Sequence, residues 1–275
     1  MIRKKLSSPE IQDMCKRMRL LGLEMAFASG QRGAHVSGSL SCMEIYGVLY
    51  GNILNFDPAN PLWEERDRFV AGKEHARLAE FPAMAEVGII SKDILFTYEE
   101  NDGILAGHPR NLDLGIEYSS MSLGMCLSYA VGKALIAKQT GKSYRVFSLL
   151  GDAECEEGSI LEAFSTASHY CLDNLIIIID RNYMSVDGNT EELMAQRDME
   201  EKLRAFGWDA VTVDGHDVSA LISALEHTPS GKPYAVIAKT IKGKGVSFIE
   251  NNKLWHQAVM SETQYNQAIK DINKA

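Results

Sequence analysis

Residues 175–179 read Leu-Ile-Ile-Ile-Ile, and this run constrains the fold more than any other part of the chain. Such β-branched side chains favour an extended backbone, and the run is far too short to span a bilayer. Because no polar residue interrupts the apolar ones, both faces of the strand must be covered. The run therefore predicts a strand that is buried on both of its faces.

The segments around this strand alternate between strand and helix patterns. We expect strands at 144–150, 175–179, 210–213 and 234–239, and helices at 122–138, 157–171, 192–206 and 218–226. This alternation predicts an α/β fold, with a parallel sheet flanked by helices. Earlier in the chain we expect helices at 8–29 and 41–54, followed by an irregular stretch at 55–118. The simplest account is a single domain over residues 1–275, with helical and looped N-terminal elaborations.

Charge and cysteine content exclude several classes of protein. The net charge of −9 and pI near 5.3 argue against nucleic-acid binding, which needs a basic patch. The five cysteines are irregularly spaced and include no C-x-x-C pair, so buried free thiols are expected. We find no apolar signal core after the first residues and no membrane-spanning run. We therefore expect a cytoplasmic protein without membrane contact.

Two polar residues follow neighbouring predicted strands. Asp152 comes after the strand at 144–150, and Asn182 comes shortly after the strand at 175–179. Ligands of open parallel sheets bind beyond the carboxyl ends of the strands. A carboxylate and an amide oxygen there can share one Mg²⁺, which keeps water and phosphate as further ligands. Alternatively, both residues could simply stabilise turns.

The two residues form part of a longer series of motifs. Gly151-Asp152-Ala153-Glu154, with Asn182 thirty residues after Asp152, resembles the Gly-Asp-Gly…Asn motif of thiamine-diphosphate enzymes. Further segments resemble the N-terminal half of transketolase in order and spacing, from about residue 8 to residue 265. These segments are Asp67–Val70, Lys73–Ala76, Gly107–Pro109, Glu157–Ser159, Phe206–Trp208, Val213–Asp217, Lys239–Phe248 and Trp255–His256.

The resemblance implies a thiamine diphosphate site with Mg²⁺. Asp152, Asn182 and the backbone carbonyl of Met184 would hold the cation. The cofactor would contact these residues: His75, Met121, Ser122, Leu123, Gly151, Ala153, Asn182, Lys242 and His256.

Histidines supply the remaining implied chemistry. His35, His108 and His256 would contact the sugar and assist proton transfer, since imidazole exchanges protons near neutral pH. We expect these three and His75 to converge on one cleft. Glu157 matches a glutamate near the subunit interface, although a helix N-terminus also favours a glutamate.

Some positions depart from the family pattern. Met121 and Cys126 replace two glycines that precede the long helix, and Ala153 replaces the second glycine of Gly-Asp-Gly. Val36 and Tyr183 stand where proline and lysine are common. These changes bear on substrate identity more than on the cofactor.

The resemblance covers only the diphosphate-binding half of the family's longer members. A complementary C-terminal transketolase subunit, the pyrimidine-binding half, would supply the glutamate that activates the cofactor. We therefore expect the N-terminal subunit of a two-chain transketolase, which self-associates into an α₂β₂ assembly. It would transfer a two-carbon ketol unit from a ketose or ketose phosphate to an aldose or aldose phosphate. The alternatives are a split thiamine-diphosphate enzyme with a modified sugar donor, and a non-catalytic cofactor-binding or regulatory protein.

Overall fold

A computed structural model describes residues 4–274, except for 102, 110, 120–121 and 228–229. Its centre is a parallel sheet in the order β1-β2-β3-β5-β4. The strands are β1 (Arg68–Ala71), β2 (Val146–Gly151), β3 (Leu175–Arg181), β4 (Asp209–Asp214) and β5 (Tyr234–Lys239). The run at 175–179 lies in β3, where every residue is buried. The predicted parallel α/β fold is confirmed.

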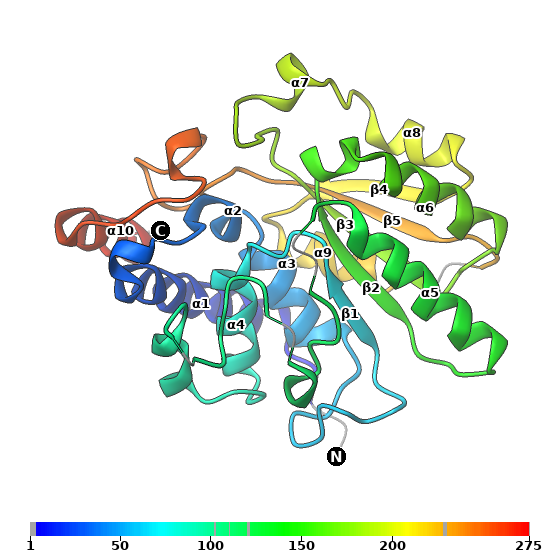
Figure 1. Ribbon diagram of the computed structural model, residues 1–275, viewed down its shortest axis with the longest axis horizontal. Helices are drawn as coiled ribbons and strands as arrows, with labels where there is room; N and C mark the ends of the chain where they lie inside the picture. Colours follow the sequence, from blue (N-terminus) through cyan, green and yellow to red (C-terminus); the bar gives the residue numbers. More distant parts are fainter. Residues whose placement is uncertain (1–3, 102, 110, 120–121, 228–229, 275) are drawn as a thin grey trace.

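Helices cover both faces of the sheet (Figure 1). One face packs against α5 (Met125–Gln139), α6 (Gly158–His169) and α8 (Met199–Ala205). The other face packs against α1 (Ser8–Ala28), α3 (Met43–Val48), α4 (Arg77–Glu86) and α9 (Val218–Leu225). Alternate residues of β3 point to the two faces. Ile176 and Ile178 lie in the core on the side of α1, and Ile177 and Ile179 lie in the core on the side of α5. This is why the run contains no polar residue.

Three short or peripheral helices complete the chain. They are α2 (Val36–Leu40), α7 (Thr190–Leu193) and α10 (Glu262–Lys274). The segment that carries α7 projects from the body of the molecule (Figure 1). Within the described residues, no helix is both long and apolar enough to cross a lipid bilayer.

Local chemistry explains several helix boundaries. The carboxylate of Glu10 accepts a hydrogen bond from the backbone N–H of Ser7, as expected for the start of α1. Asp198 and Asp217 accept backbone N–H groups in the first turns of α8 and α9. These contacts satisfy donors that have no partner inside the helix.

The structure differs from the sequence prediction in four details. The stretch 55–118 contains β1 and α4, because a strand of four residues is too short to show periodicity. The predicted helix 192–206 is broken into α7 and α8. The predicted helix 41–54 divides into α3 and a π-helical turn at Leu49–Ile53. The five cysteines are free thiols, but Cys171 is exposed rather than buried.

Candidate active site

The carboxyl ends of the strands open into a cleft of about 580 Å³. Loops that follow β1, β2, β3 and β5 supply its walls, as expected for an open parallel sheet. The cleft is lined by most of the residues that the resemblance assigns to the cofactor and the cation: His75, Leu123, Gly151, Asp152, Ala153, Asn182, Met184, Lys242 and His256. Ser122 is exposed and is not part of this lining, and Met121 lies outside the described residues.

Three residues that line this cleft carry oxygens of different chemistry. These oxygens belong to the carboxylate of Asp152, the side-chain amide of Asn182 and the backbone carbonyl of Met184. Asp152 is buried, and its burial and the neighbouring Asp180 raise its pKa, while Arg181 acts in the opposite direction. The Met184 carbonyl already accepts a hydrogen bond from the Lys242 ammonium at 3.0 Å. Carboxylate, amide and carbonyl oxygens are the ligands that a hard cation takes, so the chemistry of this donor set fits Mg²⁺.

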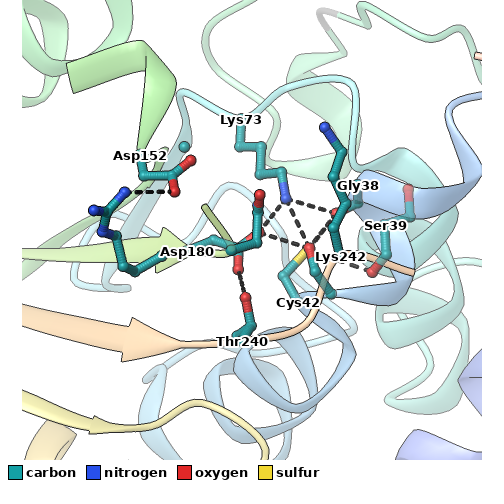
Figure 2. A network of polar contacts seen from close by, with 12 residues as sticks. Gly38, Ser39, Cys42, Lys73, Asp152, Asp180, Thr240 and Lys242 are labelled. Carbon is teal, nitrogen blue, oxygen red and sulfur yellow. Dashed lines mark hydrogen bonds and ion pairs between the residues drawn. The ribbon is translucent and has the colours of Figure 1, made fainter. Parts of the chain in front are cut away.

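A buried ion pair supports the loop of Asn182 (Figure 2). The carboxylate of Asp180 contacts the Lys73 ammonium and the Thr240 hydroxyl, and it accepts the Ser41 hydroxyl at 2.6 Å. Burial works against ionisation, but Lys73 and these hydrogen bonds still lower the pKa of Asp180. Asp180 also accepts Nδ2 of Asn182 at 2.9 Å. The pair thus fixes the orientation of a predicted cation ligand.

Three histidine rings stand together beside the cation residues. The ring centroids of His35, His75 and His256 lie 5.2–5.3 Å from one another. Two backbone hydrogen bonds of 3.0 and 3.1 Å join Ala34 to Ala258, which brings distant parts of the chain into register here. Burial and neighbouring positive charges lower the pKa of His35 to about 4 and that of His256 to about 3. Burial, with Lys73, also holds the pKa of His75 well below its usual value. All three rings are therefore neutral near pH 7.

Hydrogen bonds set the tautomers of two histidines. His108 is exposed, and its Nδ1 lies 3.0 Å from a carboxylate oxygen of Glu74. Since a carboxylate only accepts, Nδ1 carries the proton and Nε2 is left as an acceptor. At His256, Nδ1 lies 3.4 Å from the Lys242 ammonium, so the proton belongs on Nε2. Glu74 directly precedes His75, so this contact holds His108 beside the loop that carries His75.

The Glu154 carboxylate links two loops beside the cleft. Its two carboxylate oxygens accept the backbone N–H groups of Gly124 and Gly151, each at 3.1 Å. A Cβ atom on Gly72 would lie 2.7–2.8 Å from the same oxygens, so the loop after β1 also packs against them. Burial raises the pKa of Glu154 to about 7. Glu154 stands within the motif Gly151–Glu154, but the sequence alone predicts no role for it. Its place two residues after a strand-end aspartate was a usable signal.

Other positions that depart from the family pattern can now be placed. Cys126 is buried and its thiol donates to the Ala71 carbonyl at 3.0 Å, so its side chain points toward β1. Ala153 begins a short 3₁₀ helix, where a methyl group is tolerated. Tyr183 has a φ of 62°, and its N–H donates to Asp152 at 2.7 Å. Val36 is buried at the start of α2, and Glu157 lines the cleft beside the N-terminus of α6.

The mouth of the cleft carries exposed apolar side chains. Those that also line the cleft are Leu123, Val186, Leu193 and Met194, which are 49–61% exposed. Contiguous exposed apolar side chains commonly mark interaction surfaces.

Comparison with known proteins agrees with this geometry. Residues 11–272 match the family described as transketolase, thiamine diphosphate binding domain. The chain is 37% identical to one of the subunits of the apulose-4-phosphate transketolase of Phocaeicola vulgatus, over 96% of this chain and 94% of that protein. It is 36% identical to the 6-deoxy-6-sulfo-D-fructose transketolase subunit SqwG of a Clostridium species, over 96% of this chain and 97% of that protein.

A solved structure gives the same fold. The transketolase of Campylobacter jejuni superposes with a TM-score of 0.91 at 28% identity. The match covers 98% of this chain but only 43% of that longer one.

Proposed function

Because the chain belongs to the transketolase family, as its thiamine diphosphate binding domain, we propose that it is one subunit of a two-chain ketol transferase. The observation that carries this proposal is how its relatives are named. Relatives that match over 94–97% of their own length are named as subunits, whereas the transketolase of C. jejuni is more than twice as long as the match. A complementary chain would then supply the pyrimidine-binding half.

The apolar mouth of the cleft supports a partner at this face. Leu193 and Met194 stand more than half exposed on the projecting segment around α7 (Figure 1). Obligate interfaces resemble a core cut in half, so such side chains fit a surface that another subunit covers. Self-association of the paired subunits into α₂β₂ is part of the same proposal.

The donor is proposed to be a modified ketose. The relatives named above act, by their names, on apulose-4-phosphate and on 6-deoxy-6-sulfo-D-fructose. These names favour the modified-donor alternative over an unmodified ketose phosphate. The clustered neutral histidines argue against a non-catalytic binding protein, which would have no use for them.

The chain's own residues would divide the work as follows. Asp152, Asn182 and the Met184 carbonyl would bind Mg²⁺, and Lys242 would neutralise the diphosphate. Thiamine diphosphate, when bound, supplies the group that stabilises a carbanion. Nε2 of His108 would accept a proton from the sugar, and Nε2–H of the neutral His256 would donate a hydrogen bond to it. His35 and His75 would exclude water and orient the substrate.

The test is reconstitution. The chain is purified alone and with its complementary chain, and ketol transfer is assayed with unmodified, branched and sulfonated ketoses at saturating Mg²⁺ and thiamine diphosphate. We expect turnover only with both chains, and a preference for a modified donor. D152A, assembled in the same way, is the matched inactive control. Turnover by the chain alone would refute the split-enzyme proposal. A preference for unmodified donors would refute the proposal that the donor is a modified ketose.

A further inference from the structure

Arg181 occupies an unusual place for an arginine. It is the last residue of β3, it precedes the predicted cation ligand Asn182, and it is only 3% exposed. Its Nη1 donates to Asp152 Oδ2 at 3.1 Å and to the Thr190 hydroxyl at 2.9 Å, while Nη2 contacts Glu191. Its guanidinium also stacks 4.0 Å from the centre of the Tyr183 ring. Both terminal nitrogens and one face of this planar group therefore have partners.

The contacts of Asp152 show what this achieves. Oδ2 accepts Nη1 of Arg181 and the backbone N–H of Tyr183 at 2.7 Å. Among the residues that the structure describes, Oδ1 accepts only the N–H of Ala153, at 2.9 Å. A carboxylate oxygen has two strong acceptor directions, so Oδ2 is filled and Oδ1 keeps one direction free. The free direction belongs to the oxygen that can bind a cation.

We propose that Arg181 is a positioning residue that holds Asp152 with Oδ1 presented to the divalent cation and ties this ligand to the projecting segment 190–197. The proposal rests on the proposed function, because it requires the cation site. Hydrogen-bonded partners of metal-binding carboxylates orient them in this way. Arginine suits the task better than lysine, since its planar fork serves three acceptors at once.

The second half of the link runs through Glu191. Its carboxylate contacts Arg181 and also accepts the N–H groups of Gln196 at 3.0 Å and Arg197 at 3.1 Å. These bonds fold the segment that carries Leu193 and Met194 back to the cleft mouth. One guanidinium thus joins the cation ligand to the apolar surface proposed for the partner.

Simple charge repulsion predicts the opposite effect on cation binding. A fixed positive charge close to Asp152 should weaken cation binding, so its removal should strengthen it. The positioning role predicts that removal weakens binding, because Asp152 loses its orientation. The sign of the change therefore separates the two explanations.

The experiment titrates the full chain, assembled with its complementary chain, with thiamine diphosphate at a series of Mg²⁺ concentrations. The readout is the Mg²⁺ concentration that gives half-maximal cofactor binding by calorimetry. For R181M we expect this midpoint to rise about 10–100-fold, as for other outer partners of metal ligands. R181K keeps the charge but loses the fork, so a smaller rise in the midpoint is expected.

E191Q is the matched control, because it loosens the segment while leaving the contact of Arg181 with Asp152. It should increase amide hydrogen exchange in 190–197 and leave the Mg²⁺ midpoint unchanged. A midpoint that stays constant or falls in R181K or R181M would overturn the inference. If R181M does not fold, R181K decides alone. Failure of the unmodified assembly to bind thiamine diphosphate with Mg²⁺ would instead refute the proposed function.

Discussion

Asn182 donates a hydrogen bond from its side-chain Nδ2 to Oδ2 of Asp180 at 2.9 Å, and this contact decides which end of its amide faces the cation position. The amide oxygen, which accepts the N–H of Met184 at 3.0 Å, is thereby turned toward the loop that would hold the cation. The buried ion pair of Asp180 and Lys73 is thus more than a packing feature, because it fixes a ligand that could otherwise flip.

The first prediction concerns that ion pair. D180N should lower the free energy of unfolding by about 3–5 kcal/mol, because it leaves the Lys73 ammonium buried without a counter-charge. The double variant K73M/D180N should recover part of this loss, since neither member of the pair then carries a charge. Urea denaturation checks both. D173N, which breaks the half-exposed pair with Lys138, is the control and should cost about 1 kcal/mol or less. A D180N effect as small as that of D173N would contradict the prediction.

The second prediction concerns Glu154, whose pKa rises from 4.5 to about 7 on folding. Between these values the folded chain keeps a proton that the unfolded chain has released. Stability must therefore fall as pH rises through this window, by at most about 3 kcal/mol, and stay level above it. E154Q cannot titrate, so the difference in unfolding free energy between the parent and E154Q should shrink over the same range. Urea denaturation at several pH values measures it, and a constant difference would refute the assignment.

The third prediction concerns the histidine cluster. The pKa of His35 is lowered to about 4 and that of His256 to about 3, so below about pH 6.5 the unfolded chain binds protons that the folded chain does not. This lowers stability as pH falls from 6.5 toward 4, on the order of 1 kcal/mol per ring after allowance for its exposed part. H35N/H256N should flatten this decline in thermal-denaturation scans. H169N, at an exposed end of α6, should leave the decline as it is.

The fourth prediction concerns His108 in the reconstituted enzyme. H108N should lower kcat/KM by about 10²–10⁴-fold, because it removes the proposed proton acceptor. Binding of thiamine diphosphate, measured by calorimetry, should not change. E74Q should give a smaller loss, since it frees the tautomer but keeps the imidazole. If H108N lost as much affinity for thiamine diphosphate as it lost in kcat/KM, His108 would bind the cofactor instead.

Local pattern was enough to predict four strands of the sheet but not the edge strand β1. The run in β3 predicted a strand buried on both faces, with Asn182 shortly after its end, and the strand at 144–150 led in the same way to Asp152. β1 escaped notice because its four residues gain their structure from pairing with β2 rather than from their own pattern. The resemblance, rather than periodicity, named His75 and Lys242.

The supporting contacts could not be predicted from local sequence. Ser41 and Asp180 are 139 residues apart, yet their side chains touch, and no spacing rule joins them. No sequence pattern singles out Arg181, and only the fold shows that it reaches Asp152 and Glu191. Sequence indicated which groups carry chemistry, whereas tertiary contacts decide how they are held.

The two backbone hydrogen bonds between Ala34 and Ala258 also set an order of events during synthesis. All five strands end by Lys239, so the sheet can assemble before the residues that close the histidine cluster have left the ribosome. The histidine cluster therefore draws on both ends of the chain, because His35 follows Ala34 and His256 precedes Ala258. The last segment to be synthesised is the one that completes it.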